Sequence, residues 1–122
     1  MFVKRKPKYN NTRTADGFPS KLEQAVFNKL TERQLLGEIR NLRRQAVVVL
    51  INGSQKEQIT WRIDFMFEEV SSGQIVCVEA KGFETDVYRL KLKLFRHIRP
   101  YKLEIYKGTY KNPYLAETIL AR

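Results

Sequence analysis

The chain has 122 residues, a length typical of one domain, and 43% of them are hydrophobic, enough to form a buried core. Its 23 Lys and Arg residues against 13 Asp and Glu give a formal net charge of +10, which predicts a polyanionic partner such as nucleic acid. One cysteine and one histidine are too few for a disulfide framework or a structural zinc site, and the lack of disulfides fits the cytoplasm. No apolar run has membrane-spanning length, so we expect a cytoplasmic protein that does not enter a membrane.

Residues 1–19 are polar and basic, and we interpret them as an N-terminal arm that is either extended or disordered. Residues 20–122 are expected to form a single domain. Its first element is a helix over residues 20–36, with Ser20 as the N-cap and Gly37 as the stop. The helix carries apolar residues at helical spacing: Leu22, Val26, Phe27 and Leu30.

Three strands are predicted next. The apolar run 46–51 is typical of a strand buried on both faces, the Asn52-Gly53 turn follows it, and further strands are expected over 58–68 and 74–81. A second helix is predicted over 85–98, with its apolar face formed by Val87, Leu90, Leu94 and Ile98.

Pro100 ends this helix, Lys102–Tyr106 is a short fourth strand, and the tail from Asn112 to Arg122 is predicted as a short helix. The order α-β-β-β-α-β predicts an α/β fold, with a small mixed sheet of about four strands flanked by helices.

Alternation in residues 61–67 and 75–81 fixes the register of one predicted hairpin. Folding the chain about Ser71-Ser72 places Phe65 opposite Val78 on an apolar face, with Phe67 opposite Val76 and Ile63 opposite Ala80. The same register places Asp64 directly opposite Glu79 on the other face. Like charges in this arrangement destabilise a hairpin, so the pair is expected to bind a divalent cation such as Mg²⁺.

Glu23 is a third candidate ligand. On a helical wheel it falls inside the apolar stripe of the first helix, where a carboxylate is costly unless it is paired, hydrogen-bonded or bound to metal. However, Ser20-Lys21-Leu22-Glu23 also matches the capping box, which explains the glutamate without a metal. Lys81 likewise is either part of the site or an ordinary lysine at a strand end. The sequence leaves both pairs of alternatives open.

These residues together resemble the PD-(D/E)XK nuclease superfamily, which has a glutamate in the first helix, an aspartate on a strand and Glu-X-Lys on the next strand. In detail the chain is similar to a small phage-encoded group related to Holliday junction resolvases. The similarity is carried by Gly17–Glu23, Ile63–Phe65 and Val78–Lys91, within a region that covers roughly residues 17–106. Ile63 replaces the proline of the motif.

The resemblance implies a restriction-endonuclease-like core and a Mg²⁺- or Mn²⁺-dependent endonuclease that hydrolyses phosphodiester bonds in branched DNA. By this resemblance Asp64, Glu79 and the Ala80 carbonyl ligate the metal, and Glu23 binds it directly or through water. Lys81 orients the attacking water and stabilises charge on the phosphate. The resemblance also implies the cytoplasm of a bacterial host, and a resolvase that cuts two strands symmetrically is expected to be a homodimer.

Basic side chains in the arm, the second predicted strand and the second helix are candidate DNA contacts, although each is equally well explained as a solvated surface charge. They are Lys4, Arg5, Lys6, Lys8, Arg13, Arg62, Arg89, Lys91, Lys93 and Arg96. Three alternatives to a junction resolvase remain open. The chain could cut flaps, forks or ordinary duplex, could bind DNA on the same fold without catalysis, or could be a small basic structural protein.

Overall fold

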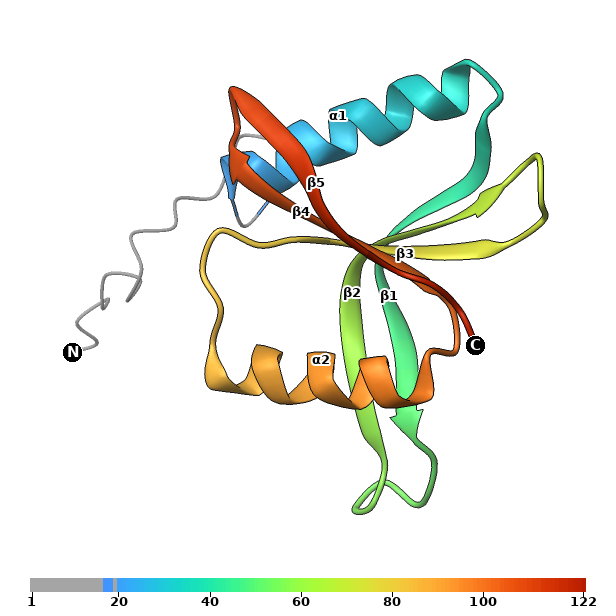
Figure 1. The fold of residues 1–122 in the computed structure, drawn as a ribbon, viewed down its shortest axis with the longest axis vertical. Helices are drawn as coiled ribbons and strands as arrows, with labels where there is room; N and C mark the ends of the chain where they lie inside the picture. The colour runs from blue at the N-terminus through green and yellow to red at the C-terminus, as the bar shows by residue number, and fades with distance from the viewer. Residues whose placement is uncertain (1–16, 19) are drawn as a thin grey trace.

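The structure is a computed structural model that describes residues 17, 18 and 20–122 (Figure 1). It has an α/β fold in which two helices flank a five-stranded mixed sheet with the strand order β1-β2-β3-β4-β5. The elements are α1 (Lys21–Leu35), β1 (Ile39–Ile51), β2 (Ile59–Glu69), β3 (Ile75–Ala80), α2 (Asp86–Ile98), β4 (Lys102–Thr109) and β5 (Asn112–Ile119). Strands β3 and β4 are parallel, and the other neighbouring strands are antiparallel. Within the described chain, neither helix is long and apolar enough to cross a membrane.

The predicted order of the first six elements is confirmed, but the prediction of about four strands is wrong. Residues Asn112–Ile119 form the strand β5, not a helix. This strand pairs with β4 from Leu103↔Ile119 to Thr109↔Asn112 and so satisfies backbone groups that a helix would leave unpaired on β4. The tail carries little periodicity of its own, so its conformation follows from the neighbouring strand.

Strand β1 lies at one edge of the sheet, and the prediction that it is buried on both faces is wrong. Its run of β-branched residues alternates in exposure, since Val48 and Leu50 are buried while Val47 and Val49 are 56% and 45% exposed. The inner residues pack in the core beneath α2. A continuous apolar run is typical of a central strand, but in this protein it forms an edge strand.

The two helices cover opposite faces of the sheet, which gives the protein two core clusters. Alternation along β3 shows this division, because Val76 and Val78 pack on the α1 side while Cys77 packs on the α2 side. The α1 cluster consists of Phe18, Leu22, Val26, Leu30, Ile39, Phe65, Phe67, Val76, Val78 and Ala80. The α2 cluster consists of Val48, Leu50, Trp61, Ile63, Met66, Cys77, Tyr88, Leu92, Phe95, Leu103, Ile105 and Ile119.

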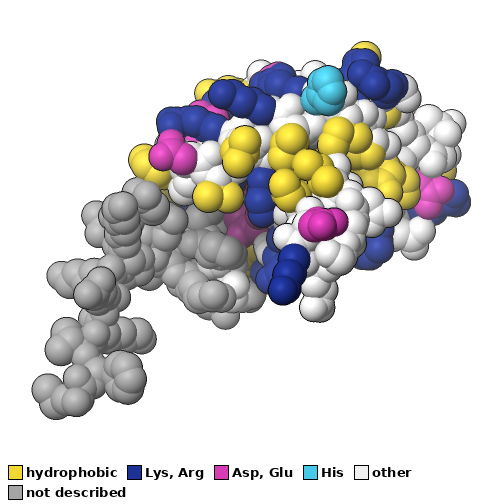
Figure 2. Space-filling model, turned by 90° about the horizontal axis from the view of Figure 1, so that it is seen from below, with side chains coloured by type: hydrophobic (Ala, Val, Ile, Leu, Met, Phe, Trp, Pro, Cys, Tyr) yellow, Lys and Arg dark blue, Asp and Glu magenta, His cyan; other side chains and the backbone are white. Residues whose placement is uncertain are grey.

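Helix α2 buries only part of the predicted face. Leu94 and Ile98 pack against the α2 cluster as expected, but Val87 and Leu90 are 61% and 58% exposed. The most buried side chains of the helix are Tyr88, Leu92 and Phe95. The reason is Trp61 on β2, whose ring lies 5.7 Å from the Tyr88 ring and 5.9 Å from the Phe95 ring in edge-to-face contacts. Seen from below, the molecule exposes apolar side chains bordered by lysine and arginine (Figure 2).

Candidate active site

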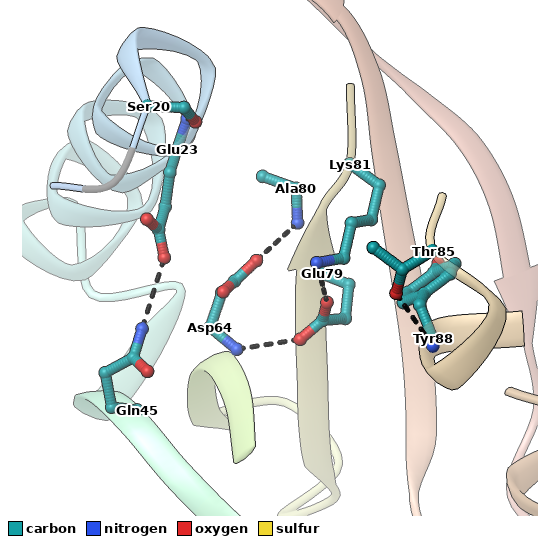
Figure 3. Close-up of polar contacts among 9 residues, drawn as sticks. All are labelled: Ser20, Glu23, Gln45, Asp64, Glu79, Ala80, Lys81, Thr85 and Tyr88. Atoms are coloured by element: carbon teal, nitrogen blue, oxygen red, sulfur yellow. Dashed lines mark hydrogen bonds and ion pairs between the residues drawn. The ribbon is translucent and has the colours of Figure 1, made fainter. Parts of the chain in front are cut away.

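The predicted register of the β2–β3 hairpin is confirmed from Phe65↔Val78 to Glu68↔Ile75. One step further, the regular ladder ends, and the carboxylates of Asp64 and Glu79 accept hydrogen bonds from backbone amides of the facing strand. The Asp64 N–H donates to Glu79 Oε1 at 2.9 Å, and the Ala80 N–H donates to Asp64 Oδ2 at 2.9 Å (Figure 3). Side-chain carboxylates thus take the place of backbone carbonyls where the two strands separate.

Strand β2 changes face at Asp64, which explains why the strands separate there. Ile63 packs in the α2 cluster and Phe65 in the α1 cluster, although residues two apart share one face of a regular strand. The prediction that Ile63 and Ala80 share an apolar face is therefore wrong. In β1, Gln45 lies between the partners of Ile63 and Phe65, opposite Asp64, and its φ of 55° shows a distorted backbone at the same level.

The backbone of Glu23 takes part in the cap of α1, but its carboxylate is not the capping-box carboxylate that the sequence also allowed. Its N–H donates to the Ser20 Oγ at 3.1 Å, which confirms Ser20 as the N-cap of α1. Its carboxylate, however, points away from Ser20 and toward Asp64, and its Oε1 accepts a hydrogen bond of 3.3 Å from Gln45 Nε2 (Figure 3). The side chain is only 3% exposed. The cap fixes the first turn of α1, and the carboxylate extends from it toward the strands.

Lys81 lies directly after the last residue of β3, at the edge of the carboxylate group. Its Nζ is 3.8 Å from Glu79 Oε2 and 4.9 Å from the centroid of the Tyr88 ring. Its backbone N–H donates to the Tyr106 carbonyl at 2.9 Å, which ties this position to β4. The ammonium is 30% exposed, whereas Glu79 is almost fully buried. Lys81 can therefore contact both the carboxylates and a ligand arriving from solvent.

The three carboxyl groups have raised pKa values. Burial is the main cause for Glu23, whose pKa rises to about 8, and the charge of Asp64 adds to the effect. Burial also raises the pKa of Asp64, and burial followed by the charge of Asp64 raises the pKa of Glu79 well above its usual value. The nearby Lys81 opposes all three shifts without cancelling them. The three carboxyl groups together therefore favour binding a proton or another cation.

The donor chemistry of this group fits a hard divalent cation, which prefers carboxylate and carbonyl oxygens. Among the described residues, no three His, Cys, Asp or Glu side chains are already arranged to hold a metal ion. Glu79 is turned toward the Asp64 amide, and Lys81 lies against its second oxygen. Binding of a metal would therefore require side-chain rotations within this group, including movement of Lys81 away from Glu79.

Three residues near the carboxylates were not identified from the sequence. Gln45 is hydrogen-bonded to Glu23. It lies opposite Asp64 at a point where the β1 backbone is distorted, and the sequence does not indicate this distortion. The Arg44 guanidinium lies 3.8 Å from the Phe18 ring centroid and lowers the pKa of Glu23. The buried Tyr88 hydroxyl has no hydrogen-bond partner among the described residues. In the sequence Tyr88 is an ordinary helix residue, and no pattern predicts that its side chain lies near the carboxylates.

The candidate DNA-binding residues have different surroundings. On α2, Arg96 forms a two-bonded ion pair with Glu117, and Arg89 lies 3.3 Å from Asp86, so both charges are partly neutralised. Arg62 and Lys93 are exposed, and Lys91 is half-buried. The five candidates in the arm lie outside the described residues: Lys4, Arg5, Lys6, Lys8 and Arg13.

Comparisons with known proteins give a family and distant structural likenesses. The family model described as a protein of unknown function (DUF1064) matches residues 6–112. No curated protein matches the chain. Among solved structures, the crystal structure of SSO0001 matches 80% of this chain at 16% sequence identity, with a TM-score of 0.42. The chain spans about half of that protein, 51% of its length, and the likeness at this TM-score supports no conclusion about function.

Proposed function

The chain belongs to the DUF1064 family of proteins of unknown function, and we propose that it is a metal-dependent DNA endonuclease of the PD-(D/E)XK type. One observation carries the proposal. Carboxylates from α1, β2 and β3, buried for Glu23 and Glu79 and half-buried for Asp64, meet beside a lysine at the point where two strands separate (Figure 3). Perturbed pKa values that arise from burial together with a specific charged neighbour cluster at functional sites.

In the proposed mechanism, Glu23, Asp64, Glu79 and the Ala80 carbonyl would hold Mg²⁺ or Mn²⁺, and the metal would supply positive charge to activate water and to stabilise the transition state at the phosphate. The amides of Asp64 and Ala80 each bond one oxygen of the Glu79 and Asp64 carboxylates at 2.9 Å, which holds both side chains at the site and leaves their second oxygens for the metal. Lys81 turns its ammonium from Glu79 toward the scissile phosphate and stabilises the charge that develops there.

Branched DNA is the proposed substrate, with the protein acting as a phage-type Holliday junction resolvase in the cytoplasm of a bacterial host. The net charge of +10 supports binding to a polyanion, and binding to phosphates is expected to weaken steeply with salt. We also propose a homodimer, because a four-way junction presents two equivalent strands to be cut and a two-fold pair of sites matches that symmetry. The same proposal includes a restriction-endonuclease-like core for the α/β fold.

Cleavage of a labelled four-way junction, beside a linear duplex of the same sequence, tests the proposal. We expect the wild type to cut the junction in Mg²⁺ and not in EDTA, with little cutting of the duplex. Glu79→Gln removes one metal ligand while keeping the size of the side chain, and it is expected to abolish cutting while leaving binding to the junction in place.

Glu57→Gln is the matched control, because Glu57 lies in the loop between β1 and β2 and is exposed. Its cutting rate should equal that of the wild type. Equal cutting of junction and duplex would retain the active site but contradict a resolvase. Binding without any metal-dependent cutting would contradict an endonuclease and favour a DNA-binding protein on this fold.

A further inference from the structure

The tip of the β4–β5 hairpin carries an exposed aromatic and basic surface. The turn between the paired residues Thr109 and Asn112 consists of Tyr110 and Lys111. Tyr110 is 47% exposed. Two lysine ammonium groups lie over its ring, Lys21 Nζ at 5.1 Å and Lys111 Nζ at 5.9 Å from the centroid. We call Lys21, Lys107, Tyr110 and Lys111 the hairpin-tip surface.

The turn itself does not require a tyrosine and a lysine at the tip. Neither Tyr110 nor Lys111 has a positive φ, and turns of this kind accept most residue types. The glycine that the hairpin needs is Gly108 on β4, with φ at 100°, where an added Cβ would lie 2.6 Å from the Asn112 carbonyl oxygen. The aromatic and basic character of the tip is therefore not set by the backbone of the turn.

The hairpin-tip surface lies beside the candidate active site. Lys21 belongs to the same first turn of α1 as Glu23, and the tip of β4–β5 approaches the start of α1 (Figure 1). Lys107 Nζ lies 3.7 Å from a carboxylate oxygen of Glu84, in the loop that follows Lys81. Tyr106, whose carbonyl accepts from the Lys81 amide, is four residues before Tyr110, about 13 Å of extended strand. DNA held at the active site would reach the tip within a few nucleotides.

Building on the proposed endonuclease function, we propose that the hairpin-tip surface binds unpaired nucleotides next to the cleavage site. A base stacks on the Tyr110 ring when the ammonium groups of Lys21 and Lys111 move from over the ring to the flanking phosphates. Alternating aromatic and basic side chains are the usual means of holding single-stranded nucleic acid, because every base presents a π-face and every nucleotide a phosphate. A continuous duplex hides its base faces, so this surface favours DNA with unpaired bases at a branch or an end.

Equilibrium binding in EDTA tests this inference without cleavage. The probes are a blunt duplex and the same duplex with a short single-stranded tail that contains 2-aminopurine, whose fluorescence reports stacking. We expect the wild type to bind the tailed probe more tightly and to change its fluorescence. Tyr110→Ala should weaken binding to the tailed probe about tenfold, with less than about twofold effect on the blunt duplex, given the usual strength of base–aromatic stacking.

Two further variants separate the ring from other effects. Tyr110→Phe keeps the ring and should bind like the wild type. Lys111→Ala should weaken binding to both probes, whereas Lys56→Ala, in the distant loop between β1 and β2, should weaken it less although it removes the same charge.

The inference is overturned if Tyr110→Ala retains the preference for the tailed probe, or if it weakens binding to both probes equally. If the wild type cuts DNA in Mg²⁺ while Tyr110→Ala behaves in this way, the proposed endonuclease stands and only the stacking surface fails. Selective loss on the tailed probe in a protein that never cuts DNA would support the surface and reject the nuclease.

Discussion

Replacing Lys81 with alanine is expected to lower the rate of DNA cleavage about a hundredfold to a thousandfold, the usual cost of removing one preorganised group that stabilises transition-state charge. The Lys81 ammonium lies 3.8 Å from Glu79 and is 30% exposed, so it can contact a phosphate. DNA binding in EDTA should change by less than about twofold, because one charge of the excess of ten is lost. Single-turnover cleavage and equilibrium binding measure the two effects separately.

Lys56→Ala is the control for charge, since it removes one lysine from an exposed loop. It should cut at the rate of the wild type. A melting curve of Lys81→Ala checks that the protein is folded, which is needed because the substitution leaves the buried Glu79 without its cation. Cleavage by folded Lys81→Ala at the wild-type rate would show that the active site is assigned to the wrong residues.

Replacing Phe65 with alanine should lower the free energy of unfolding by about 3–5 kcal/mol, the usual cost of a large aromatic deletion in a core. Phe65 is fully buried, and its ring lies 5.6 Å from the Phe27 ring and 6.4 Å from the Phe18 ring. It follows Asp64 directly on β2 and is the first residue after the change of face whose side chain packs in the α1 cluster. Chemical denaturation of the variant and of the wild type measures the difference.

Val47→Ala is the matched control on the neighbouring strand β1. Val47 is 56% exposed, so its truncation should cost less than about 1 kcal/mol. A loss of less than about 1.5 kcal/mol for Phe65→Ala would mean that the aromatic cluster does not hold α1 against the sheet as described. Larger losses for Val47→Ala would indicate that β1 is covered in solution.

The register of the β2–β3 hairpin could be predicted from the sequence because strand alternation has a period of two. A slip by one residue would have moved Phe65 and Val78 to the other face of the sheet and broken the apolar pairs, so the apolar pattern selects the observed pairing. The same pairing brought Asp64 and Glu79 together. The start of α1 was equally clear, because Ser20 has the side chain that an N-cap needs.

Features that depend on tertiary packing could not be predicted. The change of face between Ile63 and Phe65 depends on two helices that cover opposite sides of the sheet, and no local pattern reports it. The buried face of α2 was predicted only in part, because Tyr88 and Phe95 lie on a second apolar stripe that packs against the Trp61 ring. Gln45 lies at the site because the β1 backbone is distorted there, and a glutamine in the sequence does not predict such a distortion.

The most direct test of the carboxylate site is the melting temperature at pH 8 in EDTA and in saturating Mn²⁺, for the wild type and for Glu79→Gln. In EDTA the variant should be the more stable protein. The raised pKa of Glu79 means that folding favours its protonated form, so stability is lost as the pH rises above the unfolded-state pKa, and a neutral glutamine avoids this loss. Removing a strained functional group commonly stabilises a protein in this way.

Mn²⁺ should raise the melting temperature of the wild type by several degrees, since a ligand at a hundred times its Kd adds about 2.7 kcal/mol to the stability of the folded state. Glu79→Gln should show little or no increase, and Glu57→Gln should behave like the wild type. A wild type that is indifferent to Mn²⁺, or an equal increase in Glu79→Gln, would contradict the claim that these carboxylates form a metal site.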